Sequence, residues 1–355
     1  MRRRVTTILL FTAVAGLGAQ QPTIQNGRVE TRTVTSIGRE VSAVGASASP
    51  VWVAWSVPMV AGDRSLCSTW SDGYTVVRGE TLEPRNDSRP PQFPAPTGPA
   101  RLEAGTSLVV FARLLNGQVE RIRTIGDDCQ VDAGGTTIHW LTGVTPGESL
   151  QYLDSLTRAE SLNVGAARRV AESAVTAIAL HREAGADAIL DRLTGPSAAD
   201  ALRRQAASGL GAHRGAHGFD RLMGLIRDER NRDLRRHFVS ALSQNADGRA
   251  MDALLGIARA DADASVRAEA ASRYIRRAGA ASLTTALTLL DQDADESVKR
   301  RIVSSIGALP EPAATPALIQ LAKAHPNVTV RKNAVAALAR SNDPQAKALL
   351  EDLLR

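Results

Sequence analysis

The second half of the chain repeats one pattern of hydrophobic positions every 32 residues. Six ten-residue segments share this register without an insertion, and they begin at Val170, Leu202, Leu234, Val266, Val298 and Val330. Within each segment apolar residues recur at i, i+4, i+5 and i+8, which places them along one face of an α-helix. Self-similarity at a fixed period of this length is the sequence signature of a repeat architecture.

A second apolar pair follows each segment at the same step, from Leu190 and Leu193 in the first unit to Leu350 and Leu353 in the last. Gly, Pro, Asn and Asp fill the gaps between the stripes, as in GAHRGAHG (211–218), which we interpret as a flexible turn. Short polar residues that can cap a helix stand three residues before four of the first stripes. These residues are Asn231, Asp263, Asp295 and Asn327. The pattern predicts an all-α solenoid of six helical pairs.

The Val–Arg step, with Asp or Asn three residues before it, resembles HEAT repeats, specifically the short HEAT-like class of the phycobilisome lyases. The resemblance covers about 164–355 and implies the fold, but it names neither a partner nor an activity. Lyase activity is not expected, because the repeats hold no cysteine and the chain begins like an exported protein. The first unit departs from the pattern at Ala171, where the others carry Arg or Lys, as a capping repeat does.

Residues 22–145 follow a different pattern, in which short β-branched runs alternate apolar and polar positions. Runs at 28–35, 51–60, 107–115 and 117–125 are typical of strands. Asn116-Gly117 stands between the last two runs and is a strong hairpin signal. We therefore predict a small antiparallel β sandwich or barrel of no recognised family, followed by the solenoid in a multidomain chain.

The chain is predicted to have four parts. Residues 1–19 form a signal peptide, 20–146 the β-rich domain, 147–163 a capping helix and linker, and 164–355 the solenoid. Within the β-rich domain, six prolines at 83–100 exclude a helix or a central strand. We interpret this Pro-rich segment as an exposed loop, with a ligand for a proline-recognising domain as the alternative.

The N-terminus has the pattern of a secretory signal peptide: three arginines, an apolar stretch from Val5 to Leu17, and small residues beside it. An uncleaved anchor is the alternative. No later stretch reaches the ~18 uncharged apolar residues of a membrane span, so we expect no stable membrane insertion after signal removal. The expected location is periplasmic or extracellular.

The chain has two cysteines, Cys67 and Cys129. Export permits a disulfide, and an even count fits one bridge between them. Two unrelated buried thiols are the alternative. A zinc site is not expected, because two cysteines so far apart lack the paired spacing of zinc ligands.

Charge is uneven along the chain, although the formal net charge is +6. Residues 20–163 hold 12 basic and 15 acidic side chains, and the rest of the chain from 164 holds 28 and 22. This excess is too small, and too little clustered, to indicate nucleic acid. One basic residue recurs at each 32-residue step and is either a ridge for an acidic partner or a cation paired within the array. This basic ladder comprises Arg203, Arg235, Arg267, Lys299 and Arg331.

Few residues of the sequence are candidates for metal binding, ligand binding or catalysis. His213 and His217 have the spacing of zinc ligands, but the glycines around them favour a turn. On a strand, Trp52 and Trp55 face opposite sides. Core filling is the favoured interpretation of these tryptophans, and stacking of an exposed one on a ligand such as a sugar ring is the alternative. His139 and the nearby aspartates could form a catalytic or calcium site, or an ordinary acidic loop. These aspartates are Asp127, Asp128 and Asp132.

No Gly-x-Ser-x-Gly, phosphate loop or HExxH motif is present, so we assign no catalytic residue, metal or cofactor. We expect the second helices of the pairs to line the concave side of the solenoid, as the resemblance implies. Their residues one step outside the core are candidates for binding a protein partner. They are Asp220, Arg227, Asp252, Arg259, Thr284, Thr288, Gln320 and Lys323.

The leading hypothesis is an exported, non-enzymatic scaffold that binds a protein partner through the solenoid. A carrier that grips a sugar or peptide with the tryptophan-bearing β domain is the first alternative. An enzyme whose site follows no recognised motif is the second.

Overall fold

The computed structural model describes residues 21–45, 49–61, 66–67, 69–71, 76–83, 93, 105–158 and 165–353. The chain divides into two compact units, 1–149 and 150–355, with the boundary inside helix α2 (Pro146–Thr157). The predicted signal peptide and nearly all of the Pro-rich loop lie outside the described residues. No helix among the described residues is both long and apolar enough to span a bilayer.

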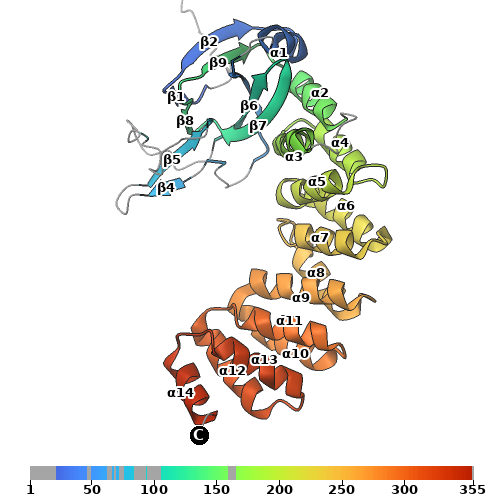
Figure 1. Ribbon diagram of the computed structural model, residues 1–355. Helices are drawn as coiled ribbons and strands as arrows, with labels where there is room; N and C mark the ends of the chain where they lie inside the picture. The colour runs from blue at the N-terminus through green and yellow to red at the C-terminus, as the bar shows by residue number, and fades with distance from the viewer. Residues whose placement is uncertain are drawn as a thin grey trace, which may run out of the picture. The chain divides into compact units, whose positions relative to one another are not determined.

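The first unit contains two sheets (Figure 1). The larger has the order β2-β9-β3-β6-β7 and the smaller β1-β8-β5-β4. Helix α1 (Ile37–Gly45) follows β2 and was not predicted from the sequence. The strand bounds are β1 (Thr23–Gln25), β2 (Arg28–Thr33), β3 (Val51–Pro58), β4 (Thr69–Ser71), β5 (Val76–Thr81), β6 (Ser107–Leu115), β7 (Gln118–Gly126), β8 (Gln130–Asp132) and β9 (Thr137–Thr142).

The prediction of purely antiparallel sheets is wrong in part. The pairs β3–β6 and β6–β7 are antiparallel, but β9 runs parallel to both β2 and β3, and β8 runs parallel to both β1 and β5. Parallel strands of one sheet require a crossover rather than a hairpin, and α1 lies in the crossover from β2 to β3, which flank β9. Hairpin signals report only on strands adjacent in sequence, so they did not reveal these pairings. The β6–β7 hairpin is as predicted, with positive φ at Asn116 and Gly117.

Strand β3 is buried on both faces, because both faces of the larger sheet are covered. Trp52 enters a core built from both sheets and meets Phe111 edge-on, with ring centroids 6.3 Å apart. Trp55 points the other way and donates from its indole nitrogen to Ser149 at 2.8 Å. Cys67 and Cys129 lie in the same core as Trp52 and form the predicted disulfide, with Cα atoms 5.6 Å apart.

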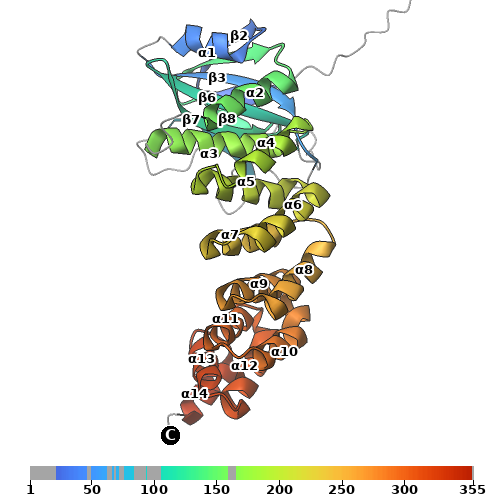
Figure 2. The ribbon, with the colours of Figure 1, turned by 90° about the vertical axis from the view of Figure 1, so that its right-hand side faces the viewer.

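The second unit carries the predicted solenoid (Figures 1 and 2). Each 32-residue unit supplies a first and a second helix, which confirms the six helical pairs. The first helices are α3 (Gly165–Leu180), α5 (Asp200–His213), α7 (Arg232–Leu242), α9 (Ala264–Ala278), α11 (Glu296–Ile306) and α13 (Val328–Leu338). The second helices are α4 (Gly185–Leu193), α6 (Gly215–Asp228), α8 (Arg249–Ala260), α10 (Leu283–Gln292), α12 (Glu311–Ala324) and α14 (Pro344–Leu353).

The first helices form the closely stacked side of this array, and we take this side as its inner side in place of the second helices. Each first helix packs along the first helix of the next unit, whereas successive second helices from α4 to α12 share few contacts. Stacked helices lie closest on the inner side of a curved array. Two of the second helices also pack on a different neighbour than predicted. Helix α8 packs mainly on α9 rather than on α7, and α12 packs mainly on α13 rather than on α11. A sequence period fixes the length of a unit but not where it starts.

The segment 211–218 is not the flexible turn that its glycines suggested. Helix α5 continues to His213 and α6 begins at Gly215, so only Arg214 separates them. A Cβ on Gly211 would lie 2.2 Å from the carbonyl oxygen of Ala241, and one on Gly218 would lie 2.0 Å from that of Leu210. These two glycines permit close approach of helices rather than freedom of the backbone.

Candidate binding groove on the inner face

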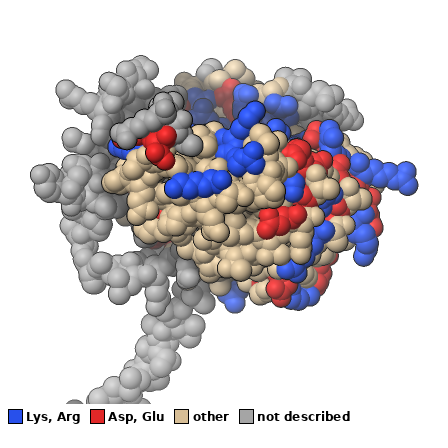
Figure 3. Space-filling model, turned by 90° about the horizontal axis from the view of Figure 1, so that it is seen from below, with Lys and Arg blue, Asp and Glu red and all other residues tan. Residues whose placement is uncertain are grey.

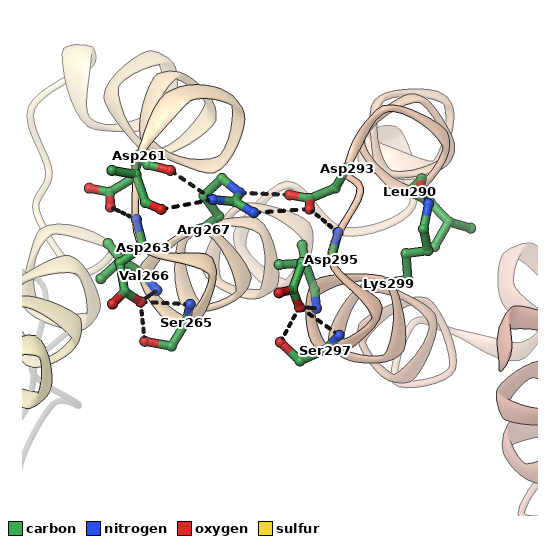
Figure 4. Close-up of polar contacts among 12 residues, drawn as sticks. Asp261, Asp263, Ser265, Val266, Arg267, Leu290, Asp293, Asp295, Ser297 and Lys299 are labelled. Carbon is green, nitrogen blue, oxygen red and sulfur yellow. Dashed lines mark hydrogen bonds and ion pairs between the residues drawn. The ribbon is translucent and has the colours of Figure 1, made fainter.

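The basic ladder is part of the framework of the array. Arg267 on α9 donates to the carboxylate of Asp293 through Nε at 2.7 Å and Nη2 at 3.1 Å, and its Nη1 donates to the carbonyl of Asp261 at 2.9 Å (Figure 4). It therefore ties the turn before its own helix to the turn before the next. Two further ladder residues make the equivalent ion pair, Arg203 with Glu229 and Arg235 with Asp261.

Each of these carboxylates also holds the start of the next helix. Asp293 accepts from the backbone N–H of Asp295 at 2.8 Å, and Asp295 in turn caps α11 by accepting from Ser297 and Val298 (Figure 4). Burial acts to raise the pKa of Asp293, but the hydrogen bonds from Arg267 and Asp295 outweigh it and hold that pKa below its usual value. The predicted caps at Asn231, Asp263, Asp295 and Asn327 are all confirmed.

The last two ladder residues bind carbonyl groups instead of carboxylates. Lys299 donates to Leu290 at 3.0 Å, and Arg331 donates to His325 at 2.7 Å and Pro326 at 3.0 Å. Each ladder cation thus has an acceptor within the array, and the side chains of Arg203, Arg235 and Arg267 are only 10–20% exposed. The interpretation of the ladder as a ridge for an acidic partner is wrong, and the interpretation as internally paired cations is correct for Arg203, Arg235 and Arg267.

A different set of arginines lines a groove across the first helices. Two hollows of about 420 Å³ each share Arg236, Glu269 and Arg301, so they form one depression over α5, α7, α9 and α11. We call it the inner groove. Its charged lining comprises Arg204, Asp233, Arg236, Glu269, Arg273, Arg300 and Arg301. Five positive charges less two negative ones leave +3, so the structure gathers the basic patch that the linear sequence did not show.

One buried carboxylate organises the centre of the inner groove. Glu269 is 5% exposed and accepts from Arg273 Nε at 2.6 Å and from Arg301 Nη2 at 3.4 Å. Arg236 approaches it to 3.9 Å, which is too far for a hydrogen bond. The side chains of Arg236 and Arg301 are each 44% exposed. These guanidinium groups keep donors available on the surface of the groove.

The arginines of the inner groove contribute to lowering the pKa values of two neighbouring side chains, Arg276 and His237. Burial, then Arg273, lowers the pKa of Arg276, with Arg301 acting in the same direction and Glu269 opposing. Burial also lowers the pKa of His237; the hydrogen bond to the Arg204 carbonyl and the charge of Glu269 oppose this lowering, whereas the charges of Arg204 and Arg273 add to it. His237 lies between Ser208 Oγ at 3.1 Å and the Arg204 carbonyl at 2.9 Å. A neutral imidazole there adds no charge to the groove.

The eight residues proposed for partner binding are all exposed, but they lie on second helices, outside the inner groove. Asp220 accepts from Arg249 Nη1 at 2.9 Å, and Arg227 pairs with Asp228 at 2.9 Å. In the view of Figure 3, acidic and basic side chains are interspersed beside a largely uncharged area. The role of these eight residues in binding stays a prediction.

The remaining candidates from the sequence are the tryptophans and the histidines. Trp52, Trp55 and Trp140 are at most 2% exposed, which confirms core filling for these three and excludes Trp52 and Trp55 from stacking on a ligand. The side chain of Trp70 lies outside what the structure describes. No cluster of three or more His, Cys, Asp or Glu side chains suited to a metal occurs among the described residues. His217 contacts Asp191 at 3.2 Å, and His139 lies 3.5 Å from Glu30.

Residues 186–273 and 283–355 match the family model of HEAT repeats, so the predicted resemblance is confirmed and the C-terminal region is built of HEAT repeats. No curated protein matches the chain. Two solved structures are similar, each at 16% identity, with a TM-score of 0.31 and over 57% of this chain. The first is human deoxyhypusine hydroxylase in complex with glycerol, and the match covers 90% of that chain. The second is the CpcE–CpcF complex of phycocyanin lyase from Nostoc sp., and the match covers 80% of that chain.

Proposed function

We propose that this HEAT-repeat chain is an exported, non-enzymatic scaffold that binds a protein partner along the inner face of its helical array. The observation that carries the proposal is the contrast between two sets of arginines. The ladder arginines are held by acceptors inside the array, whereas Arg236 and Arg301 are surface-exposed in a continuous groove. Solenoids present extended concave surfaces of this kind to their partners.

Export rests on the N-terminal signal pattern and is supported by the disulfide, because such bonds persist in oxidising compartments such as the periplasm and the extracellular space. The carrier alternative loses its main support, since three of the four tryptophans are buried.

Site-specific photocrosslinking tests which surface meets the partner. A photoreactive phenylalanine analogue is placed at Ser304, which is exposed in the inner groove, or at Thr288, which is exposed on the second helix α10. Each full-length variant is expressed and irradiated in its own source. We expect one crosslinked protein from position 304 and none from position 288.

A crosslink from position 288 alone would move the binding surface to the second-helix residues proposed from the sequence. No crosslink from either position, with both variants folded and exported, would contradict the scaffold proposal.

A further inference from the structure

The inner groove also indicates the chemistry of what it binds, an inference that rests on the proposed function. Its lining is dominated by guanidinium groups, with hydroxyl groups from Ser240, Ser265, Ser297 and Ser304. Among the described residues, no aromatic ring other than the His237 imidazole lines it, and Ala268 is its only aliphatic lining residue. An amphipathic helix would find no apolar strip there, and nucleic acid bases would find no aromatic side chain besides the His237 imidazole to stack on.

The arginines of the groove have fewer close carboxylate partners than the arginines of the ladder. Arg300 makes no hydrogen bond or ion pair to any described residue, and the nearest carboxylate oxygens to Arg236 lie at 3.8 and 3.9 Å. Glu269 is shared by Arg273 and Arg301. Guanidinium groups pair with carboxylates through two parallel hydrogen bonds, so several donors remain for an external acceptor.

The length of the groove fits an extended segment of peptide. It crosses four stacked first helices, from Arg204 on α5 to Arg300 on α11. Packed helices lie about 8–10 Å apart, so three steps span roughly 24–30 Å. An extended chain covers this span with about eight residues, at ~3.3 Å per residue.

We infer that the inner groove binds an acidic, extended peptide segment of a protein partner, whose carboxylates pair with Arg236, Arg300 and Arg301. Glu269 accepts a hydrogen bond from one of these guanidinium groups, Arg301, and lies 3.9 Å from another, Arg236. It also competes with the ligand for them, because it is itself a carboxylate. Binding is therefore expected to depend on acidic side chains, to be spread over several arginines, and to weaken with added salt.

Fluorescence anisotropy of a labelled octaglutamate peptide with the full-length protein tests the inference. A Ser–Gly octapeptide and an eight-nucleotide oligothymidylate serve as probes of neutral peptide and of general polyanion binding. We expect octaglutamate to bind at least about tenfold more tightly than either, with the difference from the neutral peptide shrinking at high salt.

Charge-neutralising variants locate the site. Arg236→Gln/Arg301→Gln is expected to weaken octaglutamate binding at least about tenfold. The matched control Arg182→Gln/Lys347→Gln removes two exposed charges that lie outside the inner groove and is expected to change octaglutamate binding less than about twofold. Arg300→Gln is a further test that leaves all described contacts intact, and about a threefold loss is expected. Glu269→Gln, if folded, should bind more tightly than the wild type.

Equal losses in the groove and control variants would overturn the inference, because net charge alone would then explain binding. Tighter binding of oligothymidylate than of octaglutamate would replace the acidic peptide with a nucleic acid ligand. A crosslinked partner at position 304 without octaglutamate binding would refute this inference while leaving the scaffold proposal intact.

Discussion

At the scale of single residues, two arginines adjacent in sequence have opposite roles. Arg235 belongs to the ladder and pairs with Asp261, whereas Arg236 is turned about 100° further around the same helix and faces the inner groove. The sequence contains a signal for this second set. The residue after each ladder cation is basic in four of five units, as Arg204, Arg236, Arg300 and Lys332. This second column of basic residues was not predicted as a binding surface, because the stricter repeat of the ladder beside it stands out more clearly.

Removing a ladder arginine is expected to destabilise the array. Arg267→Ala loses the two-pronged ion pair to Asp293 and the hydrogen bond to Asp261, at a cost of about 2–3 kcal/mol. Arg259→Ala, on the exposed surface of α8, is the control and should change the free energy of unfolding by less than about 0.5 kcal/mol. Urea unfolding followed by circular dichroism measures both. Equal effects would contradict a structural role for the ladder.

The ladder also predicts a pH dependence of stability. The pKa of Asp293 is lower in the folded state than its usual value of about 3.9, so its contribution is complete at higher pH and is lost as the pH falls through the folded-state pKa. Asp293→Asn should therefore differ most from the wild type at neutral pH and progressively less toward pH ~3. Urea midpoints measured across this range give the difference. A difference that grows on acidification would contradict the assignment.

At the scale of elements, the sequence predicted the helices better than the strands. Every helix of the array contains its predicted apolar stripe, because six repetitions average out local ambiguity and the caps mark the starts. The short strand β8 and the strand β9 lack any partner nearby in sequence, so their parallel pairing could not be read from turns. The inner face was misassigned because a repeat carries no marker of its own beginning.

Two helical glycines give a matched test of close helix packing. Gly211→Ala on α5 should cost about 1–3 kcal/mol or more, because its Cβ would meet the backbone of Ala241 on α7. Gly256→Ala on α8 has no heavy atom within 4 Å of its Cβ and should stabilise the protein by about 0.5–1 kcal/mol. Thermal unfolding compares the two. A neutral Gly211→Ala variant would show that α5 and α7 pack less closely than described.

At the scale of the whole molecule, the chain combines a disulfide-bonded β unit with a cysteine-free HEAT array, and each has its own core. The β unit holds all four tryptophans, so their fluorescence reports its unfolding alone. The helices dominate circular dichroism at 222 nm, since most of them belong to the array. Two signals can therefore follow the two units separately.

Loss of the disulfide should affect only the first of these signals. The Cys67→Ser/Cys129→Ser variant releases a loop closed over 62 residues, worth about 4 kcal/mol in the chain-entropy model. We expect the tryptophan fluorescence midpoint to move to lower urea while the helical midpoint stays within error. Equal shifts of both signals would show that the two units unfold as one.

Arginine modification by phenylglyoxal, read by mass spectrometry, tests most directly that the inner groove is the binding face. In the free full-length protein, Arg236, Arg300 and Arg301 should react at least about tenfold faster than Arg203, Arg235 and Arg267, because the ladder guanidinium groups are bonded and shielded. Saturating octaglutamate should protect the three groove arginines and leave Arg259 on α8 reactive. The account is contradicted if the ladder reacts as fast as the groove, or if the peptide protects Arg259 as strongly as Arg236.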